Sequence, residues 1–348
     1  MSRDVGLKEA LAVLAEGRDL DGHAMAAVMR TVMTGGATDA QIGALLLGLR
    51  AKGETIEEIA AAARVMRELA TPVTVPGNFD LVDLVGTGGD GANLFNVSTA
   101  ATFVAASGGA RVAKHGNRSV SSTSGSSDVL ETLGVPLDLA PEQIARAIAE
   151  VGVGFMFAPA HHSAMRHATG PRRELGMRTL FNVLGPLTNP AGVRRQVLGV
   201  FDGALCEPLA QALGELGSEH ALVVHGEDGL DEFSLAAPSQ VAELKGGAVR
   251  CYTVTPEELG IERRPVDSLT VDSADASARL IRAALAGEND DAAALIALNA
   301  GATLYVAGIA GSLGDGVRLA EDLLATGQAA EKLKAFIDFT RLMAEEDA

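Results

Sequence analysis

A glycine-rich segment that follows a short apolar run is the sharpest candidate for a phosphate site. It reads VGTGGDG at residues 85–91, and small residues with helical spacing come after it. Glycines let backbone N–H groups approach an anion closely, and a helix N-terminus adds the positive end of its dipole. The segment also matches the dinucleotide pattern G-x-G-x-x-G, but no acidic residue that could hold a ribose occurs between Asp90 and Asp128, so NAD is disfavoured. On its own, the segment fits a phosphate site and an ordinary strand–helix turn equally well.

A second segment combines two full positive charges with many hydroxyl groups. It begins KHGNRS at residues 114–119 and continues VSSTSGSS to residue 127. Lysine supplies a point charge for phosphate oxygens, and hydroxyl groups can donate hydrogen bonds to them. A flexible serine linker is the alternative, but such linkers seldom begin with a compact basic cluster. If both segments follow parallel strands, they lie at the sheet edge where ligands of open α/β folds bind.

Two further segments carry side chains that could act on a substrate. The run DGLDEF at residues 228–233 could hold Mg²⁺, which proteins bind through one or two carboxylates plus phosphate oxygens, although an acidic surface turn is the commoner explanation. Arg172 could hold a carboxylate through two parallel hydrogen bonds, and a solvated helix start explains it equally well. The adjacent His161 and His162 do not have the i, i+4 spacing of a zinc-binding pair, so a zinc site is disfavoured.

The elements that must position these segments change type near residue 72. Helical spacing of apolar residues predicts helices over 7–14, 23–33, 42–49 and 56–69, followed by a linker over 72–78. Beyond the linker, helical patterns alternate with predicted strands over 81–85, 111–114, 154–157, 196–200 and 221–224. A hairpin is expected around residues 246–247, residues 161–185 read as mostly helical with a break at Gly170–Pro171, and residues 273–343 read as helical. We therefore predict an α/β fold with a mainly parallel central sheet, divided into a helical domain at 1–71, with a contribution from about 165–185, and an α/β domain at 72–348.

Composition and charge exclude several classes of protein. The 348 residues include 28 Lys and Arg against 45 Asp and Glu, and this net charge of −17 opposes a nucleic-acid binder or an anionic-membrane binder. Two cysteines provide no disulfide framework and fit a cytoplasmic setting, and the N-terminus lacks a signal-peptide pattern. The uncharged run at 292–314 is rich in Ala and Gly, which favours two short buried helices over a membrane span.

Taken together, these segments show that the chain resembles the anthranilate phosphoribosyltransferases. The matching stretches occur in the family's order: GTGGDGANLFNVSTA (86–100), KHGNRSVSSTSGSSDVLE (114–131), GVGFMFAPAHHSAM (152–165), GPRRELGMRTLFNVLGPLTNP (170–190) and LDEFS (230–234). The resemblance implies a nucleoside phosphorylase/phosphoribosyltransferase-like fold and a cytoplasmic homodimer. It also implies transfer of the 5-phosphoribosyl group from 5-phosphoribosyl 1-pyrophosphate (PRPP) to the amine of anthranilate, the second step of tryptophan biosynthesis from chorismate.

The same resemblance implies which residues form the site. The family's catalytic residues correspond to Lys114, Arg172, Asp231 and Glu232. Its Mg²⁺ ligands, with two ions expected, correspond to Ser98, Asp231 and Glu232. Its anthranilate contacts correspond to Gly86, Asn117 and Arg172, with lining by His115, Gly185 and Pro186. Its PRPP contacts correspond to Gly86, Gly89, Asp90, Asn96, Val97, Ser98, Thr99, Lys114, His115, Gly116, Asn117, Arg118, Ser119, Val120, Ser121, Ser122 and Ser126.

One departure from the family pattern and two alternative functions accompany this interpretation. Leu94 stands where the family often has Thr, so a hydroxyl contact is lost there. A pyrimidine nucleoside phosphorylase shares the fold, which does not by itself prove the reaction, but the LDEF and KHGNR stretches argue against it. A nucleic-acid-binding relative would need a basic surface, and the net charge of −17 opposes that function.

Overall fold

The N-terminal part of the chain is a helical bundle. The computed structural model describes residues 6–118 and 124–346. The bundle contains α1 (Leu7–Ala15), α2 (Gly22–Met33), α3 (Asp39–Lys52) and α4 (Ile56–Leu69), which confirms the four helices expected from apolar spacing. Capping boxes begin two of them, because Thr38 accepts a hydrogen bond from the Gln41 N–H and Thr55 accepts one from the Glu58 N–H. Their buried faces form one apolar cluster.

A central sheet follows the bundle. Within the described residues it has seven strands in the order β3-β2-β1-β4-β5-β6-β7. The neighbours from β3 to β5 run parallel, and β6 and β7 form an antiparallel hairpin at the edge, so the mainly parallel sheet and the hairpin are confirmed. The strands are β1 (Leu81–Gly86), β2 (Arg111–Gly116), β3 (Val153–Phe157), β4 (Arg195–Gly199), β5 (His220–Gly226), β6 (Ser239–Lys245) and β7 (Ala248–Val254).

The strand order fixes where a ligand can bind. The chain builds outward from β1 to β2 and β3, then returns to place β4 on the other side of β1. Connections therefore diverge on either side of the β1–β4 pair, which leaves a crevice at the carboxyl ends of these strands. Gly86 and Gly199 are register partners at those two ends. The predicted glycine-rich loop begins at this point.

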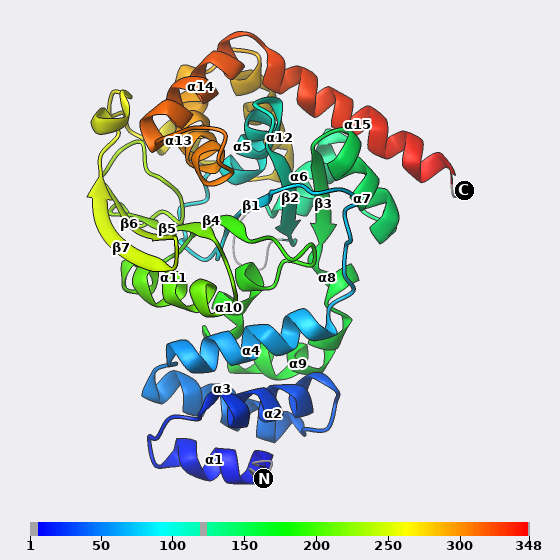
Figure 1. Ribbon diagram of the computed structural model, residues 1–348, viewed down its shortest axis with the longest axis vertical. Helices are drawn as coiled ribbons and strands as arrows, with labels where there is room; N and C mark the ends of the chain where they lie inside the picture. Colours follow the sequence, from blue (N-terminus) through cyan, green and yellow to red (C-terminus); the bar gives the residue numbers. More distant parts are fainter. Residues whose placement is uncertain (1–5, 119–123, 347–348) are drawn as a thin grey trace.

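Helices cover both faces of the sheet. On one face α5 (Val97–Ser107) packs against α13 (Asp290–Val306) and α15 (Gln328–Glu346), and on the other α11 (Cys206–Glu215) packs between the sheet and α4 (Figure 1). The remaining helices are α6 (Ser126–Leu133), α7 (Pro141–Glu150), α12 (Ala274–Leu285) and α14 (Leu313–Ala325), with short 3₁₀ turns at Gly203–Leu205, Glu257–Leu259 and Asp267–Leu269. No helix within 6–118 or 124–346 is long and apolar enough to cross a membrane.

The glycines of the uncharged run have a packing role. The expectation of two short helices over 292–314 is wrong, because α13 is one continuous helix and the run ends in the first turn of α14. A Cβ on Gly301 would lie 2.5 Å from the Val317 backbone nitrogen, and a Cβ on Gly316 would lie 2.2 Å from the Gly301 oxygen. The two helices therefore approach each other at glycine backbone, where no other residue fits.

The bundle is completed by a segment from much later in the sequence. α9 (Arg166–Leu175) packs against α2 and α3, flanked by α8 (Ala158–His161), α10 (Phe181–Leu184) and the turns Ser163–Met165 and Gly185–Leu187. The expected break at Gly170–Pro171 is wrong, because α9 runs through Pro171 and ends at Leu175, where Gly176, with a left-handed φ of 59°, caps it. A proline crowds the side chain of the residue before it, and Gly170 has none, so the helix continues.

Candidate active site

The acidic run and the glycine-rich loop meet at the crevice between β1 and β4. The Gly88 N–H donates a 2.7 Å hydrogen bond to Asp231 Oδ2. A Cβ on Gly86 would lie 2.3 Å from that same oxygen, and a Cβ on Gly199 would lie 1.6 Å from the backbone oxygen of Asp231. The loop carrying Asp231 therefore rests directly on the glycine ends of both strands, and two segments 143 residues apart form one site.

Three carboxylates gather at this point. Burial, and then the charge of Asp90, raises the pKa of Asp231 to about 7. Burial and the charge of Asp231 raise the pKa of Glu232 well above its usual value, opposed by Lys114 and by a hydrogen bond from the Ser98 backbone. Acids that raise one another's pKa in this way are ready to accept a cation.

The donor set fits a magnesium ion shared with a substrate. Within 6–118 and 124–346, no group of three or more His, Cys, Asp or Glu side chains is placed to hold a metal ion by itself. Magnesium commonly keeps water and takes only one or two carboxylates plus phosphate oxygens. Asp231 and Glu232, with Ser98 hydrogen-bonded to Glu232 through its backbone, therefore provide a suitable but incomplete ligand set that phosphate oxygens or water would complete.

Lys114 reaches the same site from β2. Its side chain is 2% exposed, and its Nζ donates to the Leu84 carbonyl at 2.6 Å and to Ser98 Oγ at 3.3 Å. Burial lowers the pKa of this ammonium, and the carboxylates of Asp83, Glu232 and Asp231 oppose the shift. Three carboxylates thus stabilise a buried cation next to the start of α5.

The α5 start is held in place by a small polar network. Asn96 precedes α5 but does not cap it with its side chain. Instead its Oδ1 accepts 2.7 Å hydrogen bonds from Ser124 Oγ and Ser277 Oγ. Val97 and Thr99 are buried in the first turn, and the Thr99 hydroxyl has no partner within the described residues. Asn96 therefore orients the loop over α5, which leaves the first turn without a side-chain cap.

The end of the KHGNR segment is more open. Asn117 and Arg118 are exposed, and the Arg118 guanidinium pairs with Asp128 at 2.9 Å and Glu131 at 3.0 Å. The Ser126 hydroxyl donates to the Asn117 carbonyl at 3.4 Å, and a Cβ on Gly116 would meet that hydroxyl. The structure thus brings Asn117 and Ser126 together but engages Arg118 with α6. The expected contacts at residues 119–122 lie outside the described residues.

A second cluster lies on the side that faces the helical bundle. The rings of His115 and His162 have centroids 5.1 Å apart and planes tilted by 59°. Burial lowers the pKa of His115 well below its usual value, and burial followed by the charge of His161 lowers the pKa of His162 to about 4. Both rings are therefore neutral at pH 7, and within the described residues neither Nε2 has a hydrogen-bond partner. Gly185 provides a backbone acceptor for His115.

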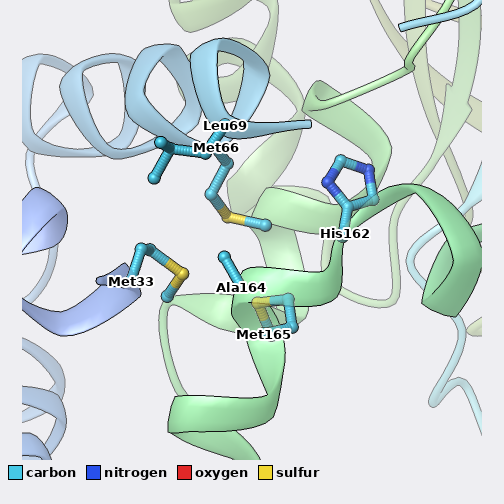
Figure 2. A pocket seen from close by; sticks show the side chains of 6 residues that line it. All are labelled: Met33, Met66, Leu69, His162, Ala164 and Met165. Carbon is cyan, nitrogen blue, oxygen red and sulfur yellow. The ribbon is translucent and has the colours of Figure 1, made fainter. Parts of the chain in front are cut away.

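A small apolar cavity lies between His162 and the bundle. Figure 2 shows His162 above Ala164 and Met165, with Met33 and Met66 facing them from the bundle. Leu69 completes the lining. His162 therefore contacts both His115 and the junction between the helical bundle and the α/β part.

Arg172 lies on α9 with its guanidinium 5.1 Å from the centre of the Phe181 ring. Burial lowers its pKa. No hydrogen bond or ion pair from another described residue holds this half-buried cation. A guanidinium in that position is suited to a planar carboxylate.

Three residues at the site are not among those predicted from the sequence. Asp83 is a fully buried charge inside β1, a signal visible as an acid within a predicted apolar strand. Gly199 ends β4, and its importance depends on contact with a loop more than 30 positions later. Arg178 donates to the Gly89 carbonyl and stacks 4.0 Å above Phe201, which ties the glycine loop to the segment after α9.

Comparison with family models identifies both parts of the chain as glycosyl transferase domains. A family model described as "Glycosyl transferase family, helical bundle domain" matches residues 8–70, and one described as "Glycosyl transferase family, a/b domain" matches residues 78–330. The chain is 60% identical over 342 residues to the anthranilate phosphoribosyltransferase of Saccharophagus degradans, covering 97% of this chain and 100% of that protein.

Solved structures agree with this assignment. The anthranilate phosphoribosyltransferase of Thermus thermophilus superposes with a TM-score of 0.90 at 46% identity, covering 95% of this chain and 99% of that one. The Saccharomyces cerevisiae enzyme, solved in complex with PRPP and Mg, gives a TM-score of 0.86 at 27% identity and covers 96% and 98%. The chain belongs to the anthranilate phosphoribosyltransferase family.

Proposed function

We propose that this chain transfers the 5-phosphoribosyl group of PRPP to the amine of anthranilate, giving N-(5-phosphoribosyl)anthranilate and pyrophosphate. The observation that carries the proposal is the meeting of Asp231, Glu232 and Lys114 at the glycine ends of β1 and β4. Family membership supports the same reaction, which is the second step of tryptophan biosynthesis from chorismate. Neither source favours the alternative pyrimidine nucleoside phosphorylase.

The donor half of the site stabilises the leaving pyrophosphate. Negative charge accumulates on pyrophosphate as its bond to the ribose C1 breaks, so stabilising that charge is the main catalytic task. Lys114 provides a buried ammonium beside Ser98, and the backbone of the glycine loop lies close by. Bound Mg²⁺ supplies Lewis-acid neutralisation of the developing charge, and Asp231, Glu232 and Ser98 would hold it. We expect two ions, because a diphosphate carries more charge than one cation offsets.

The acceptor half orients anthranilate. The Arg172 guanidinium holds the carboxylate, and the neutral His115 and the backbone of Gly185 line the place for the ring. The amine then approaches C1 from the face opposite to pyrophosphate. Holding two reactants in this geometry is itself a large part of the acceleration. The aryl amine is weakly basic, so its proton leaves late to water or to pyrophosphate, with no side chain assigned as base.

The activity assay mixes the protein with anthranilate, PRPP and Mg²⁺ and follows the loss of anthranilate fluorescence. Thymidine or uridine with inorganic phosphate replaces the substrates in a parallel reaction. The proposal expects turnover in the first mixture and none in the second. The reverse result would establish a nucleoside phosphorylase.

Arg172→Ala tests the acceptor half separately. Losing a charge-assisted hydrogen-bonded contact of about 1.5–3 kcal/mol raises the KM for anthranilate on the order of 10–100-fold. PRPP affinity, measured by calorimetry with Mg²⁺, stays unchanged. Arg173→Ala, which removes the exposed neighbouring arginine, is the matched control and leaves both constants near the wild-type values. Equal losses for both substrates in Arg172→Ala would contradict the assigned role.

The proposal also covers the two domains of the chain, its oligomeric state and its cellular location. We propose a helical domain at 1–71, completed by residues 165–185, and an α/β domain at 72–348, supported by the packing of α9 on α2 and α3. We also propose a homodimer, which is what the resemblance to the anthranilate phosphoribosyltransferases implies. The free, exposed Cys251 thiol supports the cytoplasm. Light scattering on the purified protein measures the oligomeric state, and a monomer would contradict the dimer.

A further inference from the structure

A buried carboxylate lies directly beneath the site and takes no part in the mechanism above. Asp83 is in the middle of β1 with no exposed surface. Asn189 Nδ2 donates a 2.8 Å hydrogen bond to its Oδ2, and the backbone N–H of His115 donates to its Oδ1 at 3.3 Å. No ion pair within 4.0 Å joins Asp83 to a described cation, although the charge of Lys114 acts on it. The carboxylate is thus held mainly by hydrogen bonds.

These hydrogen bonds connect both halves of the site. His115 belongs to the acceptor half, and its strand neighbour Lys114 belongs to the donor half. Asn189 also donates a 2.8 Å hydrogen bond to the Ala113 carbonyl, so it ties β2 to the segment after α10. That segment carries Gly185, the backbone acceptor for the His115 ring. Asp83 therefore joins β1, β2 and the Gly185–Asn189 segment at one point.

Stability of the fold alone does not explain an ionisable side chain at this position of β1. A buried carboxylate costs free energy, and an apolar residue of similar volume in the middle of a parallel strand is often the more stable choice. Burial raises the pKa of Asp83 to about 6, because removing the ionised carboxylate from water costs free energy. Costly polar groups next to a site commonly hold the residues that touch substrate.

We propose that Asp83 is a positioning residue that holds the β2 backbone at His115 against β1 and the Gly185–Asn189 segment. It thereby aligns the aromatic acceptor beside His115 with the ribose donor beside the adjacent Lys114. The proposal rests on the proposed function, since it assigns these two residues to opposite substrates. Asp83 touches neither substrate. It acts through the His115 N–H and, by way of Asn189, through the segment that contacts the His115 ring.

Asp83→Asn tests the proposal by separating kcat from KM. The amide has the size of the carboxylate, but its NH₂ group cannot accept a hydrogen bond. One of the two donors, the His115 N–H or the Asn189 side chain, therefore loses its acceptor. We expect the two substrates to be misaligned by a fraction of an ångström. This lowers kcat on the order of 10–100-fold, while both KM values stay within about threefold. Glu58→Gln is the control for loss of a buried charge away from the site: Glu58 is another fully buried acid, hydrogen-bonded to the Leu20 N–H and paired with Lys52 at 2.6 Å inside the bundle. It leaves kcat per folded molecule at the wild-type value.

A second variant guards against failure to fold. Asn189→Ala removes the link between Asp83 and the Gly185–Asn189 segment and is expected to show the same fall in kcat with retained KM values. Wild-type kcat per folded molecule in either variant would overturn the proposal, as would a change confined to the KM for PRPP. If the wild-type protein itself fails to consume anthranilate with PRPP, the proposed function has failed, and that outcome is seen before any variant is measured.

Discussion

Gly199→Ala is expected to disable catalysis by moving the acidic loop. The added Cβ would lie 1.6 Å from the backbone oxygen of Asp231 and 2.4 Å from its carbonyl carbon. Ordinary contact begins at 3.4 Å, so the loop must retreat by about 2 Å. The obstacle is backbone rather than the flexible end of a side chain, and no rotamer change relieves it.

The magnitude follows from what that displacement breaks. Asp231 Oδ2 accepts the 2.7 Å hydrogen bond from Gly88, and Glu232 follows in the same loop. A misplacement of about 1 Å in a reacting group can cost about 100-fold in rate, so we expect kcat/KM to fall at least about 100-fold. Overpacking costs about 1–3 kcal/mol of stability, which leaves a domain of this size folded.

The assay measures anthranilate consumption across a Mg²⁺ titration, with thermal unfolding measured in parallel. The activity loss should come with a higher Mg²⁺ concentration at half-maximal rate, because Asp231 is proposed to hold the ion. Gly43→Ala on α3 is the control: no atom lies within 4 Å of the added Cβ, and a helix gains about 0.5–1 kcal/mol from alanine over glycine. Wild-type turnover with an unchanged Mg²⁺ dependence in Gly199→Ala would refute the reasoning.

Three further perturbations follow from the same geometry. Asp231→Asn combined with Glu232→Gln should abolish Mg²⁺-dependent turnover without unfolding the chain, and appreciable activity at any Mg²⁺ concentration would contradict the metal site. Lys114→Met should weaken PRPP binding about 10–100-fold by calorimetry while the KM for anthranilate changes little, since a charge-assisted contact is removed; unchanged PRPP affinity would take Lys114 out of the phosphate site. The pKa of Asp83 is raised from 3.8 to about 6, so its ionisation opposes folding. The unfolding free energy of the wild type relative to Asp83→Asn should therefore fall by up to about 3 kcal/mol as pH rises from 4 to 7, measured by urea denaturation, and a difference that does not vary with pH would contradict this.

The sequence predicts those parts of the site that local pattern determines. A glycine run after an apolar strand and the KHGNR cluster each point to phosphate chemistry without any long-range information. Alternating strands and helices predict a parallel sheet, in which both segments follow the carboxyl ends of strands. The structure confirms that β1 and β2 are parallel, so both segments begin at the same end of the sheet. The fold class was predictable for the same reason, because alternating strand and helix patterns admit few parallel arrangements.

Other features depend on contacts that no local pattern reveals. Gly199 matters because a loop more than 30 residues later rests on it, and Asp83 matters because Asn189 and His115 converge on it. The continuation of α9 through Pro171 was missed because proline usually ends a helix, whereas packing against α2 and α3 supports this one. The pairing of Arg118 with two acids on α6 is likewise a tertiary effect, and its expected contact with PRPP stays a prediction.

We expect the two proposed halves of the site to discriminate between substrates through different electrostatics. The acceptor half offers neutral histidines and one unpartnered guanidinium, Arg172, within the described residues, which suits a small aromatic carboxylate. The donor half presents Asp90, Asp231 and Glu232 beside Lys114, and these acids favour a ligand that brings cations with it, because burial and mutual charge raise the pKa of Asp231 and of Glu232. We therefore expect anthranilate to bind in the acceptor half and PRPP to enter the donor half as a magnesium complex. Specificity is then a difference in affinity between the two halves, one suited to a carboxylate and the other to a diphosphate that carries magnesium.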